Sequence, residues 1–279
     1  MTETNTSSGR ADLHLHSHFS DGTCSPTELV HMAAAAGLTA ISLTDHDTVA
    51  GTDEAAAAGR EAGVTVIPGV ELSVSYGSQE IHILGYGIDT RSRILRETLE
   101  RLAAERVERM EKMILRLQRA GVPAVFEEVR ILAGGNILSR LHLANYLLEK
   151  GFVASREESF ERYIGNGGPA YVRRRHLNLK GAISLIVSSG GLPVLAHPVQ
   201  TRRDDIIEYL VRLGIRGIEA YYPRHTAGET ARYEKICRRY GLVATGGSDF
   251  HGEGKPEVVM GAATTPPREL SSLLNHLGL

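Results

Sequence analysis

The sequence predicts an α/β fold, a closed or distorted parallel barrel that a block of helices interrupts. β-rich runs alternate with helical segments from residue 11 to residue 91, and the alternation resumes at about residue 179. Because most predicted strands are followed by a helix, parallel strands are favoured. Imidazole and carboxylate side chains stand where these strands end, and the strand ends are where such barrels carry out chemistry.

The first strand and the first helix come from a short stretch near the N-terminus. Residues 12 to 16 alternate in polarity, and successive side chains of a strand point to opposite faces, so His14 and His16 share one face. Ser25 and Glu28 have the spacing of a capping box, which predicts that a helix starts there. One face of this strand can therefore hold a metal ion.

The next strands follow with a single alanine-rich helix among them. In chain order we expect a strand at 38–44, a helix at 49–62, a strand from 64 through 72 and a strand at 79–88. The last two strands follow each other without a helix between them.

Residues 92–170 are predicted to form a helical insertion that caps the active-site face. Apolar residues recur every three or four positions from Leu99 to Leu117, which is typical of the buried stripe of a long amphipathic helix. Further helices are expected at 127–132, 138–149 and 156–163.

The alternation after the insertion completes the predicted barrel. We expect helices at 179–189, 204–213 and 228–240, and strands at 192–196, 217–221 and 242–245. The resulting division is a disordered tail at 1–10, a barrel at 11–91 and 171–279, and the insertion at 92–170.

Composition excludes several classes of protein. The formal net charge of -2 argues against a dedicated binder of duplex DNA or of an anionic membrane. The two cysteines, Cys24 and Cys237, are too few for a disulfide framework, so we expect a reducing compartment and a cytoplasmic location. The polar N-terminal stretch lacks the apolar core of a signal peptide, and no run of about 18 apolar residues could span a membrane.

Nine side chains that can bind metals stand at predicted strand ends. They are His14, His16, Asp21, His46, Glu71, His82, His197, Asp249 and His251. Imidazoles with three carboxylates suit Zn, Mn or Fe better than Ca, and a carboxylate such as Glu71 can bridge two ions. Two ions about 3.5 to 4 Å apart can clamp an oxyanion during in-line displacement. The set therefore predicts metal-assisted hydrolysis.

Six ordered motifs resemble those of the PHP (polymerase and histidinol phosphatase) family of metal-dependent phosphoesterases. They are Asp12-Leu-His-Leu-His, Ser20-Asp-Gly, Thr44-Asp-His-Asp, Gly69-Val-Glu-Leu-Ser, Ala196-His-Pro and Ser248-Asp-Phe-His. The resemblance covers nearly the whole chain and implies a distorted (β/α)7 barrel with two or three divalent metal ions. It leaves Mn, Zn, Fe and Mg open, with Mn favoured.

The resemblance also implies how the nine residues divide among the metal ions. One site takes His14, His16, Glu71 and Asp249. A second takes Glu71, His82 and His197, and a third takes Asp21, His46 and His251. Asp45 and Asp47 flank His46 and could orient its imidazole.

The helical insertion resembles that of the branch that acts on nucleoside 3',5'-bisphosphates and on the 5' ends of short RNA. In that branch the residues matching Arg140 and His142 face substrate phosphate, and Arg140 would be a bidentate clamp. The alternative for Arg140 is a surface salt bridge at a helix start. We therefore expect a hydrolase that removes the 3'-phosphate of bisphosphates, and acts on 5'-phosphorylated short RNA, by metal-activated hydroxide.

Two further segments could contact the substrate. Arg173 and Arg175 could line the mouth of the site, or belong to a solvated basic surface. His225 could bind substrate or donate a proton to the leaving oxygen, or lie in solvent. The predicted catalytic residues are thus His225 and Arg140.

Three other functions compete with this hypothesis. A phosphomonoesterase of the histidinol-phosphatase type would accept a single phosphate. An amidohydrolase shares the His-x-His opening but commonly bridges its metals with a lysine, where this chain has Glu71. A non-enzymatic metal-holding module is disfavoured because no ligand position has been lost. We expect a nucleotide or short oligoribonucleotide as partner, no duplex DNA and no membrane, and leave the oligomeric state open.

Overall fold

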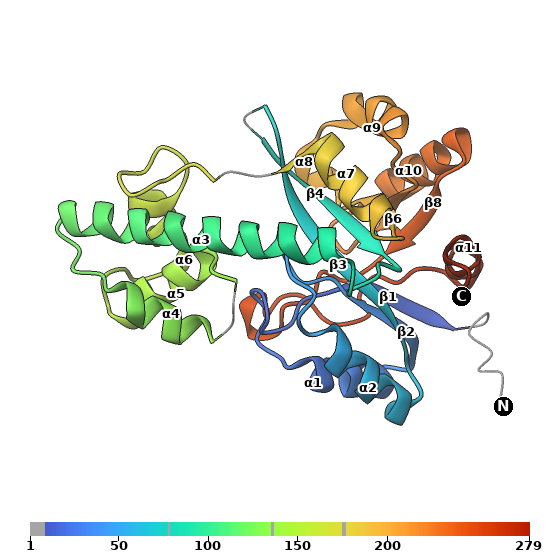
Figure 1. The fold of residues 1–279 in the computed structure, drawn as a ribbon, viewed down its shortest axis with the longest axis horizontal. Helices are drawn as coiled ribbons and strands as arrows, with labels where there is room; N and C mark the ends of the chain where they lie inside the picture. Colours follow the sequence, from blue (N-terminus) through green and yellow to red (C-terminus); the bar gives the residue numbers. More distant parts are fainter. Residues whose placement is uncertain (1–8, 78, 135–136, 175–176) are drawn as a thin grey trace.

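The computed structural model describes residues 9–77, 79–134, 137–174 and 177–279, and it has the predicted α/β architecture (Figure 1). An eight-stranded sheet runs in the order β1-β2-β3-β4-β6-β7-β8, and β5 pairs with β3. The strands are β1 (Arg10–Leu15), β2 (Leu38–Leu43), β3 (Thr65–Tyr76), β4 (Gln79–Tyr86), β5 (Leu177–Asn178), β6 (Leu192–Leu195), β7 (Gly217–Tyr221) and β8 (Val243–Gly246).

The sheet curves into a distorted barrel, which confirms the predicted fold class. At the seam, the amide of Asp249 donates to the carbonyl of His14 and the amide of His16 donates to the carbonyl of Phe250, both at 2.9 Å. The distortion is at β4, which runs antiparallel to both β3 and β6. A two-residue connection between β3 and β4 permits only an antiparallel hairpin.

Seven helices accompany the barrel strands. They are α1 (Pro26–Ala35), α2 (Thr52–Ala62), α7 (Leu179–Ser188), α8 (Pro198–Thr201), α9 (Ile207–Leu213), α10 (Ala227–Tyr240) and α11 (Pro267–Leu277). The capping box of α1 forms as expected: Glu28 N donates to Ser25 Oγ, and Ser25 N donates to Glu28 Oε2. Within the described residues, no helix is long and apolar enough to cross a membrane.

Several details differ from the prediction, among them the short elements β5 and α8, which were not expected. Helix α11 was not expected, although Leu270, Leu273 and Leu274 have helical spacing and are buried. Arg10 was assigned to the tail but begins β1. Residues 1–8 lie outside the described residues.

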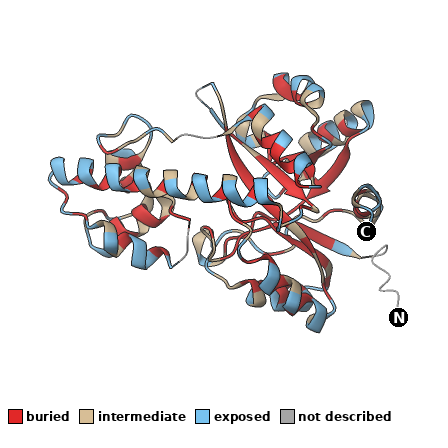
Figure 2. Ribbon diagram, viewed as in Figure 1, coloured by how far each residue is buried: buried red, intermediate tan, exposed pale blue. Residues whose placement is uncertain are grey.

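The helices of the predicted insertion gather around a hydrophobic cluster of their own, beside the sheet (Figure 1). They are α3 (Arg93–Arg119), α4 (Phe126–Ala133), α5 (Arg140–Glu149), α6 (Arg156–Ser159) and the π-helix Phe160–Ile164. The buried faces of these helices alternate with exposed ones, whereas the barrel strands are buried along most of their length (Figure 2). The boundaries at 92 and 170 stay a prediction.

A buried charged residue breaks the apolar stripe of α3. Arg106 is 6 % exposed, and its Nε and Nη2 donate to Asp47 Oδ2 at 3.1 and 2.5 Å. Arg174 donates to the same oxygen. Burial alone would raise the pKa of the Asp47 carboxyl, but Arg174 and Arg106 hold the pKa well below its ordinary value. This ion triad joins α3 and residue 174 to the loop after β2.

We expect Asp47→Ala to destabilise the fold by about 3 to 5 kcal/mol, because it leaves two buried guanidinium groups without a counter-charge. Urea denaturation followed by circular dichroism measures the change. Asp205→Ala, which removes an exposed carboxylate that pairs with Arg203, should leave the midpoint nearly unchanged. Equal midpoints for the two variants would contradict a structural role for the triad.

Candidate metal centre

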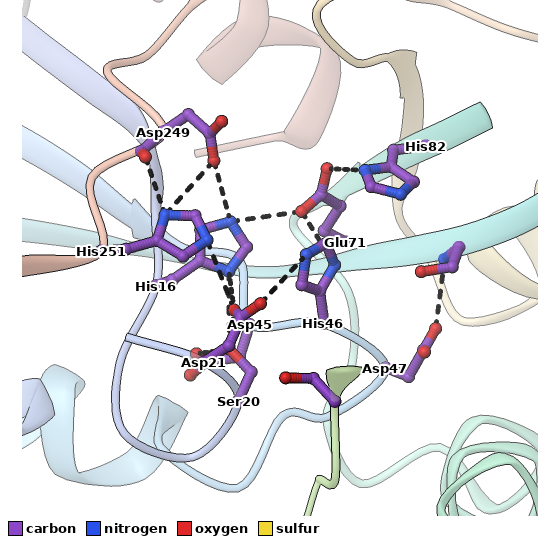
Figure 3. Close-up of polar contacts among 12 residues, drawn as sticks. His16, Ser20, Asp21, Asp45, His46, Asp47, Glu71, His82, Asp249 and His251 are labelled. Carbon is purple, nitrogen blue, oxygen red and sulfur yellow. Dashed lines mark hydrogen bonds and ion pairs between the residues drawn. The ribbon is translucent and has the colours of Figure 1, made fainter. Parts of the chain in front are cut away.

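The carboxylate of Glu71 lies at the middle of the site, 1 % exposed, on β3 (Figure 3). Its Oε1 lies 2.8 and 3.1 Å from two ring nitrogens, those of His82 and His197. Its Oε2 lies 3.0, 3.2 and 3.3 Å from three more, those of His46, His16 and His14. Five imidazoles from four segments of the barrel therefore converge on one buried carboxylate, because His14 lies in β1 and His16 directly follows this strand.

Asp249 adds a second carboxylate beside the first strand. Its Oδ1 lies 3.4 Å from His16 Nε2 and 3.6 Å from His14 Nε2. Its Oδ2 accepts from the Tyr222 hydroxyl at 3.0 Å and from Lys255 Nζ at 2.9 Å. The backbone φ of Asp249 is +59°, a left-handed conformation that costs free energy in a residue other than glycine and is often found at functional sites.

Asp21 forms the third corner of the site, next to His251 and His46 (Figure 3). Its Oδ1 lies 3.3 Å from His251 Nε2, and its Oδ2 lies 3.9 Å from His46 Nε2. The rings of His16 and His251 stack with their centroids 4.1 Å apart. His16 thus touches both the Asp249 corner and the Asp21 corner.

All nine predicted residues lie in groups whose ligand atoms are within 4.8 Å of one another. The groups are His16, Asp21, His46 and His251; His14, His16 and Asp249; His14, Glu71 and His197; and His46, Glu71 and His82. The structure therefore brings together every predicted ligand. In this grouping His82 and His197 fall into separate groups that share Glu71, whereas they were expected in one set; their individual roles as ligands stay a prediction.

The chemistry of these donors fits divalent cations. His14 Nε2 and His16 Nε2 face each other at 3.1 Å. Several buried atoms lack a hydrogen bond of suitable geometry, among them Glu71 Oε2, His46 Nδ1 and His82 Nδ1. Buried nitrogen and oxygen lone pairs without hydrogen-bond donors are expensive, and coordination to an ion satisfies them.

The two acidic neighbours of His46 bind other partners. Asp45 accepts from Ser17 N at 2.7 Å and from Ser20 Oγ at 2.6 Å, which fixes the loop that carries Asp21 (Figure 3). Asp47 pairs with two arginines, as described above. Neither carboxylate has a described hydrogen bond to the His46 ring.

A pocket opens from the Asp21 corner toward the helical insertion. Its lining includes Asp21 and His46 of the cluster, the carboxylate of Glu80, and the arginines Arg106, Arg109, Arg140 and Arg174. Arg140 is the first residue of α5, where its guanidinium donates to Asn166 Oδ1 at 3.4 Å and lies over the ring of Phe160. Arg140 therefore faces the pocket, and no described residue forms a surface salt bridge with it.

The other predicted substrate residues have fewer contacts with this site. His142 is 8 % exposed, and its Nδ1 accepts from Ser139 N in the cap of α5. Arg173 lies at a neighbouring pocket, where it donates to the Gly77 carbonyl. His225 contacts the Ala220 carbonyl and the ring of Tyr222, and among the described contacts it has none with the nine clustered residues. Arg175 lies outside the described residues.

The PHP domain family matches residues 12–163 of the chain. Over 250 residues, covering 88 % of each protein, the chain is 36 % identical to the 3',5'-nucleoside bisphosphate phosphatase of Chromobacterium violaceum. Over 246 residues it is 35 % identical to a 5'-3' exoribonuclease of Haemophilus influenzae, covering 86 % of this chain and 89 % of the relative. This chain belongs to the PHP family. This PHP protein is a metal-dependent phosphoric ester hydrolase.

Solved structures have the same PHP fold over nearly the whole chain. A structure from Bifidobacterium adolescentis, assigned as a metal-dependent phosphoesterase, superposes with a TM-score of 0.87 at 28 % identity, covering 95 % of this chain and 96 % of the other. A structure from C. violaceum, described as an amidohydrolase with bound sulfate and no metal, superposes with a TM-score of 0.84 at 33 % identity and the same coverage.

Glu219 is a residue of this PHP site that the sequence analysis did not identify. Glu219 of β7 is fully buried; its Oε1 lies 2.9 Å from His14 Nδ1, and its Oε2 accepts from His197 N at 2.7 Å. The contact between Glu219 and His14 Nδ1 directs the Nε2 lone pair of His14 toward Glu71 and Asp249. Burial by itself would lower the pKa of His14, but Glu219 and Glu71 raise it well above its usual range, and the same negative charges attract a metal cation. The sequence feature that could have identified Glu219 is its position as an acidic residue within the apolar strand Gly217–Tyr221.

We expect Glu219→Gln to weaken divalent-metal binding by about 10- to 100-fold, because the amide carries no charge and holds the His14 ring less firmly. Competition with a fluorescent chelator measures the affinity. Glu208→Gln, on an exposed face of α9, is the matched control. If both variants retained the metal equally well, Glu219 would not orient His14 for metal binding.

Proposed function

We propose that this PHP phosphoesterase removes the 3'-phosphate of nucleoside 3',5'-bisphosphates and also acts on 5'-phosphorylated short RNA. One observation carries the proposal: a single pocket is lined both by Asp21 and His46 of the candidate metal centre and by arginines. A substrate with two phosphates has one group for the metal centre and one for the arginines. The names of the two relatives, a bisphosphate phosphatase and an exoribonuclease, support the same substrate class.

The nine clustered residues would hold two or three divalent ions, with manganese favoured. Bound ions would lower the pKa of water and neutralise the phosphoryl oxygens in the transition state. The carboxylates of Glu71 and Asp249 bring the negative charge that such ions need, and the convergence of imidazoles on Glu71 suits it to a bridging position. Glu219 would keep His14 in the tautomer that leaves Nε2 free.

The protein's own groups would position the second phosphate. Arg140 lies at the N-terminus of α5, where the positive end of the helix dipole also favours an anion. Its guanidinium rests on the rings of Phe160 and Tyr171, which limits its freedom before substrate binds. A guanidinium held in place can bind two phosphate oxygens at a lower entropic cost.

The competing functions explain less of the site. A monoesterase of the histidinol-phosphatase type needs a single phosphate, so it would leave the arginines without a role. An amidohydrolase has support in the description of one C. violaceum structure. However, Lys255 ion-pairs with Asp249 at 2.9 Å, and the side chain among the histidines is the carboxylate of Glu71 and not a lysine. The proposed partner is a nucleotide or short oligoribonucleotide, and the cytoplasmic location stays a prediction.

We expect His16→Ala to lower metal-dependent phosphate release by at least about 100-fold, because His16 contacts both Glu71 and Asp249 and its loss removes one imidazole donor from the cluster. Release from adenosine 3',5'-bisphosphate is measured after loading with manganese. His31→Ala, on an exposed position of α1, is the control and should keep full activity. Full activity in His16→Ala would refute the proposed centre.

We expect the enzyme to release phosphate from adenosine 3',5'-bisphosphate but hardly from AMP. AMP has one phosphate, so it leaves nothing to hydrolyse when that phosphate binds the arginines, and leaves the arginines empty when it binds the metal centre. Arg140→Ala should raise KM for the bisphosphate by about 10-fold or more, the usual effect of losing a charge-assisted hydrogen bond. Arg130→Ala, whose side chain is exposed on α4, should leave KM unchanged. Equal hydrolysis of both nucleotides would indicate a general monoesterase.

A further inference from the structure

A second pocket continues outward from the arginines of the first. Both pockets are lined by Glu80, Arg109, Arg140 and Arg174. The outer pocket adds Arg173, Tyr171, Asn166 and Gln79, and it contains none of the nine clustered residues. The metal centre, the arginines and the outer pocket therefore follow one another in that order.

The arginines of these pockets carry more positive charge than the described carboxylates balance. Asp47 neutralises one charge of the pair Arg106 and Arg174. Glu80 lies 3.7 Å from Arg174 and also contacts His82. Within the described part of the chain, no ion pair joins Arg109, Arg140 or Arg173 to a carboxylate.

The neighbouring positive charges affect the pKa of Arg109. Its Nε donates to the Val172 carbonyl at 2.8 Å, a neutral partner. Burial, together with the nearby charges of Arg140, Arg174 and Arg106, lowers the pKa of the Arg109 guanidinium to about 10, although Glu80 acts in the opposite direction. Like charges held this close repel each other, so a bound anion would stabilise the outer part of the site.

One phosphate does not use all of this charge. A phosphate monoester carries about -1.5 to -2 at neutral pH, whereas Arg109, Arg140 and Arg173 together carry three positive charges without an ion-paired carboxylate among the described residues. Arg173 donates to the Gly77 carbonyl at the end of β3, and both residues line the outer pocket together with Arg140. There is therefore a cationic position beyond the one that holds a single phosphate.

We propose that the outer pocket binds a further phosphoryl group attached to the 5'-phosphate, so that the site takes nucleotides or RNA ends with a 5'-diphosphate. This inference rests on the proposed function for the position of the 5'-phosphate at Arg140. Arg173 and Arg109 bind the added phosphoryl group, and Asn166 and Gln79 offer amide donors to its oxygens. The chemistry at the 3'-phosphate is unchanged.

Binding to the manganese-loaded enzyme tests the inference without turnover. The probes are AMP and the methylene analogue of ADP, whose two phosphorus atoms are joined by carbon and resist hydrolysis. Isothermal titration should give about tenfold tighter binding of the diphosphate analogue. Arg173→Gln should remove the difference and Arg173→Lys should restore part of it, whereas Arg91→Gln, at a fully exposed arginine, should keep it.

Equal affinity of the wild-type enzyme for the two probes would overturn the inference. A preference that survives in Arg173→Gln would also overturn it, because the second phosphoryl group would then bind elsewhere, for example at the metal ions. These outcomes differ from a failure of the proposed function, which would appear as no phosphate release from any bisphosphate even though the probes bind.

Two substrates distinguish the sources of a 5'-diphosphate. Adenosine 3'-phosphate 5'-diphosphate and a 5'-diphosphorylated oligoribonucleotide are each compared with the matching 5'-monophosphate by the ratio of kcat/KM. A ratio well above one for either pair supports the inference and identifies a nucleotide or an RNA end as the source. Ratios at or below one for both pairs would overturn it.

Discussion

The buried carboxylate of Glu71 constrains the rest of the barrel. A carboxylate that is 1 % exposed is costly to bury unless positive charge or hydrogen-bond donors surround it. Here five imidazoles from four segments of the barrel do so. This convergence requires the strand ends to meet at one point, and the pairing of residues 249 and 250 with β1 brings the last of them into place. The site can therefore assemble only when the barrel closes.

The backbone around this carboxylate is held in unfavourable conformations. Asp47, His197 and Asp249 all have positive φ values, each of which costs about 1 to 3 kcal/mol in a residue other than glycine. All three lie just after barrel strands, and their side chains contact the site or its supporting arginines. The strands that carry them are buried along most of their length (Figure 2), and this packing stabilises the strained turns.

The helical insertion brings arginines next to the nine clustered residues. Its attachment through Asp47, Arg106 and Arg174 uses the buried charges nearest to the barrel. The remaining arginines, Arg109 and Arg140, then face the pocket that starts at the Asp21 corner. In the proposed function, these arginines of the insertion bind the part of the substrate that does not react.

The sequence by itself determined the strand ends and the residues on them. Alternation placed His14 and His16 on one face, because side-chain direction in a strand depends only on local geometry. The motifs then identified all nine clustered residues. The tertiary structure alone decided the partners: Glu219 behind His14, Arg106 in the apolar stripe of α3, and Asp47 bound to arginines in place of His46. These contacts join residues far apart in the chain, and neither periodicity nor motif spacing encodes which distant charges will meet.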